Sequence, residues 1–186
     1  MTIIGTLLTA LVISREWERG TMEAMMATPV SIIDILLGKA IPYFLLGIGS
    51  ILVCTLVAVF IYGVPLRGSF MALLATTSVF LVCSLGQGLL ISSAAKDQFV
   101  ASLVALITAF LPAFVLSGFI FEITSMPTPI QVMTYLLPVR YFVTCLQTIF
   151  LAGNVWYLFI KCMAVMALIG SAFFLIIMSK TRKRLD

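Results

Sequence analysis

Four long apolar runs organise the chain, and short polar stretches separate them. The runs extend from Ile41 to Tyr62, from Phe70 to about Ala95, from Phe99 to Phe121 and from Val155 to Met178. A helix that crosses a bilayer needs about 20 consecutive, mostly apolar residues, and each run reaches that length. The pattern therefore predicts four membrane-spanning helices joined by short connections.

The first thirteen residues are also apolar but too short to cross a bilayer alone. They would form either a helix lying in the membrane interface or the second half of a span. We favour the partial span over residues 1–13, which implies that the chain is the C-terminal part of a longer protein.

Composition supports the same class of protein. Of the 186 residues, 62% are hydrophobic and 10% are charged, whereas soluble domains average about 45–50% and about 25%. So few charges cannot cover a water-soluble globule. We therefore expect an all-α, polytopic helical bundle with no soluble catalytic domain.

The residue types leave little room for active-site chemistry. The chain has no histidine, which removes histidine-based acid–base catalysis and most zinc sites. Its four cysteines form no CxxC pair and are typical of small apolar packing residues. We expect no catalytic residue, no metal ligand and no directly bound cofactor.

The stretch from Glu122 to Asn154 contains two apolar pieces, each too short to span. Pro127, Pro129 and Pro138 interrupt them. Short, broken apolar segments are typical of re-entrant or interfacial structure. We expect residues 122–154 to form two half-helices that enter from the outer face and leave by it.

The basic residues predict the orientation. If residues 14–40 are cytoplasmic, eight of the eleven lysines and arginines lie inside and only Arg67, Arg140 and Lys161 lie outside, as the positive-inside rule requires. The basic tail at residues 179–186 is the strongest single marker and would face anionic headgroups of the cytoplasmic leaflet. Lys161, near the start of the last span, can extend its amine outward.

The charged stretch at residues 14–30 has the periodicity of an amphipathic helix lying in the membrane interface. At about 100° per residue, one face carries Trp17, Thr21, Ala24, Met25 and Thr28. The other face carries Arg15, Glu16, Glu18, Arg19 and Glu23. Met22 and Met26 are one turn apart on the charged face, a spacing that favours docking into a groove of a partner protein. Pro29 ends this helix.

Here the sequence resembles the membrane subunits of ABC-2 type exporters. The resemblance rests on the charged segment Arg15-Glu16-Trp17-Glu18-Arg19-Gly20-Thr21, followed by Thr28-Pro29 and Gly38-Lys39. A second match is the segment from Leu137 to Phe142, which is similar to an L-P-x-x-Y-F segment before the last span. The order of elements also agrees over nearly the whole chain. Bilayer physics does not demand a charged E-R-G-T helix between spans, so the first motif is fairly specific.

The resemblance implies a permease subunit of an ATP-driven exporter, usually with six spans, in a bacterial inner membrane. Its partners would be a separate ABC ATPase subunit, a second permease subunit in a homodimer or heterodimer, and membrane lipids, but no nucleic acid. ATP would act only through the partner ATPase. The coupling helix that sits in the cleft of the ATPase would carry Arg15, Glu16, Glu18, Arg19, Gly20, Thr21, Met22, Glu23 and Met26. The outer half-helices, with Pro138, Arg140 and Tyr141, would gate the exit.

The chain offers no phosphate-binding loop of its own. Its only Gly-Lys pair is Gly38-Lys39, which Ala40 follows, and Ile33 stands where such a loop needs a glycine. The energy for transport would come from another polypeptide.

Three features inside the spans predict how helices pack. Ser84, Gly88 and Ser92 repeat every four residues, a pattern that lets helices approach closely in lipid. It fits packing within one subunit and a dimer seam equally well. Gln87 needs a hydrogen-bond partner in its span, and Pro112 should kink the Phe99–Phe121 helix.

Two other functions stay open. An ion-driven secondary transporter would usually carry ionisable groups near the middle of its spans, and the spans have no Asp, Glu or Arg there. A membrane anchor derived from a permease would not transport at all. The sequence does not select a substrate.

Overall fold

The computed structural model describes residues 2–21, 32–95, 97–118 and 123–182. All regular structure in these ranges is helical. The long helices are α1 (Thr2–Glu18), α3 (Ile32–Phe60), α4 (Phe70–Ala94), α5 (Gln98–Phe114) and α8 (Trp156–Arg182). Between α5 and α8 come η1 (Ile123–Ser125), α6 (Thr128–Thr134), α7 (Pro138–Gln147) and the π-helical turn η2 (Thr148–Ala152). The expected all-α class is confirmed.

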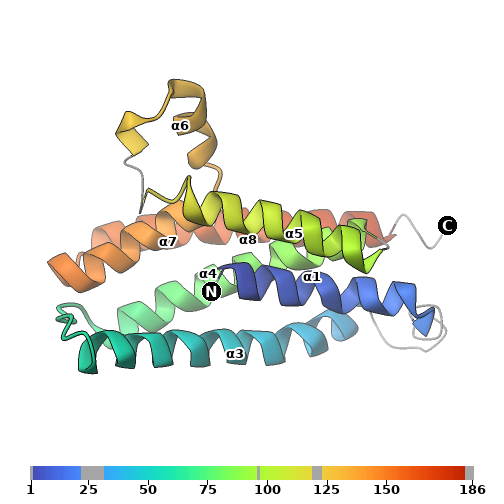
Figure 1. The fold of residues 1–186 in the computed structure, drawn as a ribbon, viewed down its shortest axis with the longest axis horizontal. Helices are drawn as coiled ribbons and strands as arrows, with labels where there is room; N and C mark the ends of the chain where they lie inside the picture. The colour runs from blue at the N-terminus through green and yellow to red at the C-terminus, as the bar shows by residue number, and fades with distance from the viewer. Residues whose placement is uncertain (1, 22–31, 96, 119–122, 183–186) are drawn as a thin grey trace.

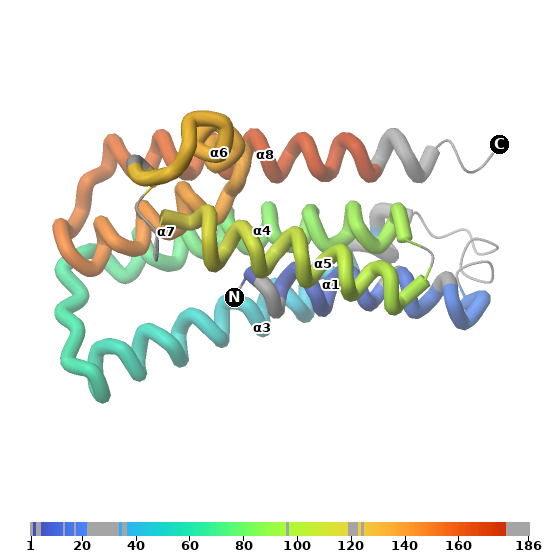
Figure 2. The backbone as a smooth tube through the Cα atoms, turned by 45° about the horizontal axis from the view of Figure 1, so that its top comes forward, coloured from blue at the N-terminus to red at the C-terminus, as the bar shows by residue number. Residues whose placement is uncertain are grey.

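The long helices form an elongated bundle, and α6 projects from its side (Figure 1). Helix α4 contacts α1, α3, α5, α7 and α8, and Figure 2 shows it between α8 and the α1–α5 pair. Both bundle ends are visible in Figure 1: α1 and α8 finish at one end, and the α3–α4 turn lies at the other. We call the first the charged end, because Arg15, Arg19 and Lys39 lie there, and the second the turn end.

Three described helices are long and apolar enough to cross a membrane. They are Leu37–Phe60 within α3, Phe70–Ala94, and Trp156–Ile177 within α8. Helices α6 and α7 with η2 pass the same test as a pair but are bent by 80°, which is the geometry of a broken span or a re-entrant loop. The two expected half-helices are therefore present as separate, bent elements.

The expected span Phe99–Phe121 differs from the structure. Helix α5 ends at Phe114 and, at 17 residues, is about 25 Å long, shorter than a hydrocarbon core of about 30 Å. Pro112 weakens its last turn by removing one donor. Gly118 then adopts a φ of +79°, a left-handed conformation in which the chain leaves the helical direction.

A hydrogen bond explains how Pro112 is tolerated inside α5. A residue at position 112 would normally donate its N–H to the carbonyl of Thr108, four residues earlier, but proline has no N–H. The side-chain amide of Gln87 on α4 donates to that carbonyl at 3.3 Å. The glutamine thus finds its partner in the backbone acceptor that the proline leaves open.

The small-residue stripe of α4 packs against α1 within the chain. The hydroxyls of Ser84 and Thr6 are hydrogen bonded at 2.9 Å, and the backbone N–H of Ser14 donates to Ser92 Oγ at 2.8 Å. A Cβ placed on Gly88 would lie 2.7 Å from the Thr6 carbonyl oxygen. Of the two interpretations of the stripe, the structure therefore selects packing within one subunit.

Candidate functional site

The charged segment begins as the last turns of α1 and not as a separate helix. We expected a partial span at residues 1–13 and a new helix from residue 14, but α1 runs unbroken to Glu18. Ser14 is fully buried, and its hydroxyl donates to the Ala10 carbonyl at 2.6 Å while its N–H reaches Ser92. The charged turn is therefore attached rigidly to the helix that packs along α4.

A glycine makes the turn after α1. Gly20 has a φ of +68°, a conformation that side chains other than glycine rarely adopt. The N–H of Arg19 still donates to the Arg15 carbonyl at 3.1 Å, so the turn closes directly on the helix end. The expected coupling residues Met22, Glu23 and Met26 lie outside the described residues.

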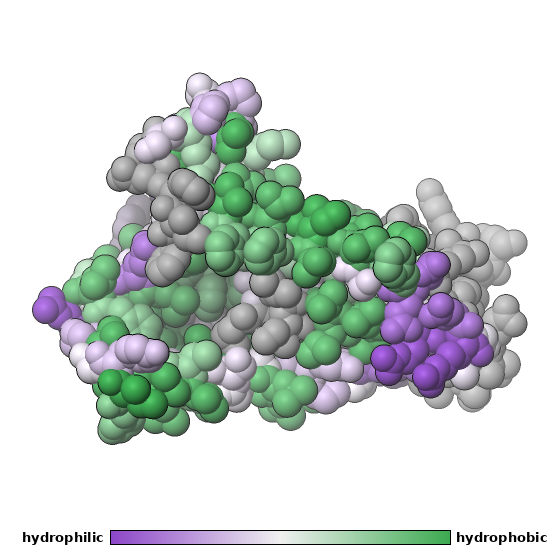
Figure 3. Space-filling model, viewed as in Figure 1, coloured by the Kyte–Doolittle hydropathy of each residue, from purple (hydrophilic) through white to green (hydrophobic). Residues whose placement is uncertain are grey.

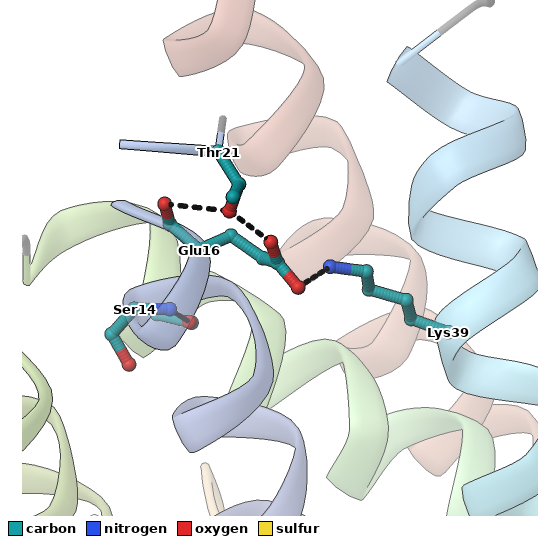
Figure 4. Close-up of polar contacts among 5 residues, drawn as sticks. Ser14, Glu16, Thr21 and Lys39 are labelled. Atoms are coloured by element: carbon teal, nitrogen blue, oxygen red, sulfur yellow. Dashed lines mark hydrogen bonds and ion pairs between the residues drawn. The ribbon is translucent and has the colours of Figure 1, made fainter. Parts of the chain in front are cut away.

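Glu16 is the centre of a polar network that links α1 to α3 (Figure 4). Its carboxylate pairs with the Lys39 amine at 2.9 Å. The Thr21 hydroxyl donates to the Glu16 carboxylate and also faces the Glu16 carbonyl oxygen at 3.2 Å. The Thr21 hydrogen bond, and then Lys39, lower the pKa of the Glu16 carboxyl below its usual 4.5. Glu16 therefore stays ionised and holds the start of α3 against the end of α1.

The other described coupling candidates of this turn lie at the surface. Arg15, Glu18, Arg19, Gly20 and Thr21 are exposed, whereas Glu16 is only partly so. They contribute to the hydrophilic patch at the charged end of the bundle (Figure 3). The sequence placed Glu16 and Glu18 together as coupling residues, but the structure distinguishes them. Glu16 pairs with Lys39 inside the chain, whereas Glu18 is exposed and has no ion-pair partner among the described residues.

The three gate candidates fasten the bend between α6 and α7. Pro138 is buried at the first position of α7. The Arg140 guanidinium lies 3.9 Å from the centre of the Tyr135 ring and donates to the Thr134 hydroxyl. The Tyr141 hydroxyl donates to the Tyr135 carbonyl at 2.9 Å. The first turn of α7 therefore fixes the last turn of α6.

A second contact at the turn end, which we call the turn clamp, was not predicted. It joins residues 67–69, in the turn between α3 and α4, to residues 149–154. The N–H of Gly68 donates to the Ile149 carbonyl at 2.8 Å, and that of Ser69 to Asn154 Oδ1 at 2.6 Å. The Arg67 guanidinium donates to the Leu151 carbonyl at 3.2 Å.

Comparison with known proteins decides the family. The model of the ABC-2 type transporter family matches residues 1–151. The chain is 52% identical to the probable multidrug ABC transporter permease YbhS of Escherichia coli strain K12, over 100% of this chain and 49% of that protein. This chain belongs to the ABC-2 type transporter family.

Two other relatives from the same strain are more distant. This chain is 29% identical to the probable multidrug ABC transporter permease YbhR, over 81% of its own length and 41% of that relative. It is 28% identical to the inner membrane transport permease YhhJ, over 98% of this chain and 49% of that relative. It thus spans about half the length of these relatives or less. No solved structure matches it.

A cluster of metal ligands and a phosphate-binding loop are both missing from the described residues of this chain. Among the described residues, no group of three or more Cys, Asp or Glu side chains could hold a metal ion. Gly38 and Lys39 lie inside the continuous helix α3, where backbone N–H groups are used by the helix. This pair therefore forms no loop that could surround a phosphate.

Proposed function

We propose that this chain is the permease part of an ATP-driven ABC-2 exporter, coupled at its charged end to a separate ATPase. The observation that carries the proposal is the charged turn Arg15–Thr21, which continues directly from α1 and is joined to α3 by the Glu16–Lys39 pair. A partner that pulls on this turn would move two helices together. Family membership and the names of the relatives support the ATPase as that partner.

The cargo would be apolar or amphiphilic. YbhS and YbhR are named probable multidrug permeases, and the helices of this chain offer mostly apolar and hydroxyl-bearing surfaces. The pathway would form between two permease subunits. The α6–α7 bend and its residues Pro138, Arg140 and Tyr141 would gate the exit.

An ion-driven transporter is a weaker candidate. The buried polar side chains of the described residues are serines and threonines, and none is an acid or a base. Ion coupling usually needs ionisable groups at the middle of the membrane.

Co-expression with an ABC ATPase subunit from the same genome, followed by co-purification, tests the proposal. Glu18→Lys should abolish co-purification, because it reverses an exposed charge that has no ion-pair partner among the described residues. Lys161→Glu is the matched control: it reverses an exposed charge in the first turns of α8, away from the charged end, and should leave binding intact. Equal co-purification of the ATPase with wild type and with Glu18→Lys would contradict the coupling role of this turn.

A further inference from the structure

A cavity of about 460 Å³ lies between α1 and the first turns of α3 at the charged end. Its walls are amphipathic. The deeper lining comes from Leu8, Leu11, Val12, Pro42 and Tyr43, and the lining nearer the helix ends from Arg15, Glu16, Gly38 and Lys39. From Leu8 to Arg15 the helix rises about 10 Å, so a bound molecule would meet charge at one end and hydrocarbon at the other.

The charged lining has an excess of one positive charge. Glu16 and Lys39 neutralise each other at 2.9 Å. Arg15 is exposed, and within the parts of the chain that the structure describes it has no ion-pair partner. A guanidinium binds phosphate through two parallel hydrogen bonds. The mouth of the cavity therefore favours an anionic phosphate group.

The surroundings of the cavity point to the bilayer as the source of the ligand. On α3, Leu37, Ile41, Leu45 and Leu46 are 48–64% exposed beside the cavity residues. A face this apolar is suited to contact with acyl chains. A lipid that lies against this face can place its headgroup at Arg15 and one acyl chain between α1 and α3.

We propose that this cavity binds one anionic phospholipid, with its phosphate at Arg15 and an acyl chain along Leu8, Leu11 and Tyr43. The lipid fills the space between the two helices that the charged turn connects. It is thus a structural ligand of the α1–α3 pair and not a transported molecule. The proposal does not depend on the transport function, because binding needs neither an ATPase nor a cargo.

Native mass spectrometry of the purified chain, with phosphatidylglycerol and phosphatidylcholine added in equal amounts, tests the site. Wild type should retain one phosphatidylglycerol in preference to phosphatidylcholine. Arg15→Gln should weaken that retention by about fivefold, the effect of one basic residue near an anionic lipid. Arg19→Gln removes the same charge one turn away, from a residue that does not line the cavity, and should retain the lipid.

A second pair of variants tests the apolar part. A Cβ on Gly38 or on Gly49 meets nothing within 4 Å, so both glycines of α3 accept a side chain without a clash. Only Gly38 lines the cavity. Gly38→Leu should fill the space and exclude the lipid, whereas Gly49→Leu should bind it as wild type does.

Four results would overturn the proposal. The first three are equal retention of both lipids by wild type, loss of phosphatidylglycerol in Arg19→Gln as large as in Arg15→Gln, and full retention in Gly38→Leu. Complete displacement of phosphatidylglycerol by an equal mole fraction of dodecyl phosphate would also contradict it. That outcome would assign the site to single-chain anionic amphiphiles, which are candidate cargo.

Discussion

Gly88 shows most directly how a single residue sets the packing of this protein. A Cβ there would lie 2.7 Å from the Thr6 carbonyl oxygen and 2.9 Å from Thr9 Cβ. The first of these atoms is backbone and cannot move aside cheaply. The absence of a side chain is therefore what allows α1 to lie directly on α4.

Gly88→Ala should lower the stability of the purified chain by about 1–3 kcal/mol, the usual effect of overpacking. Gly49→Ala is the control, because its Cβ meets nothing and alanine favours a helix over glycine by about 1 kcal/mol. Thermal unfolding in detergent compares the two. A Gly88→Ala variant as stable as Gly49→Ala would show that α1 and α4 do not approach this closely.

Gln87 and Pro112 should be coupled energetically, since one supplies the donor that the other lacks. Gln87→Leu leaves the Thr108 carbonyl without its 3.3 Å hydrogen bond and should cost about 1 kcal/mol. In a Pro112→Ala background the helix restores its own donor to that carbonyl, and Gln87→Leu should cost less. A double-mutant cycle measured by unfolding checks this, and purely additive effects would contradict it.

Glu16 should give the stability a small dependence on pH. The pKa of its carboxyl is lowered in the folded chain, so its stabilisation is present above pH 4.5 and is lost as the pH falls through the folded pKa. Because the group is close to solvent, we expect the effect to stay below about 1 kcal/mol. Unfolding temperatures from neutral pH downward should fall less steeply in Glu16→Gln than in wild type.

At the scale of elements, sequence reasoning succeeded where a hydrophobic run alone defines the helix. Helices α3, α4 and α8 contain nearly all of the predicted runs, and Pro42 inside α3 does not end that helix. Sequence reasoning missed the end of α5, because the apolar pattern continues past Phe114 although the helix does not. It also placed a boundary before Ser14, where polarity changes but the backbone stays helical.

The contacts between elements could be predicted only in part. The stripe of Ser84, Gly88 and Ser92 predicted that another helix packs closely against α4, but it did not predict that this helix is α1. The turn clamp left no sequence signal, because its acceptors at Ile149 and Leu151 are backbone carbonyls and the residues lie about 80 positions apart. Such a contact follows from the fold and from no local pattern.

Gly68→Ala should loosen the turn clamp. A Cβ at Gly68 would lie 2.9 Å from the Ile149 carbonyl oxygen, so the turn must move away and its hydrogen bonds lengthen. Hydrogen exchange should then become faster at the backbone N–H groups of residues 68 and 69, which are the donors of the clamp. Pro65→Ala, at an exposed position of the same turn, is the control and should leave the exchange unchanged.

For the molecule as a whole, the charged end and the turn end should lie on opposite sides of the membrane. In a variant without native cysteines, Thr21→Cys should react with a membrane-impermeant thiol reagent only after the cells are opened. Val64→Cys, exposed in the α3–α4 turn, should react in intact cells. Labelling of Thr21→Cys in intact cells would show that the charged end lies outside, and would contradict the coupling role.

Helix α3 also constrains how movement at one membrane surface reaches the other. At 29 residues it is about 43 Å long. Treated as a stiff rod pivoting at Lys39, it would carry Phe60, about 31 Å away, sideways by about 3 Å for a tilt of about 5°. A shift of that size would break the 2.8 Å hydrogen bond from Gly68 to Ile149 unless the half-helices moved with α3.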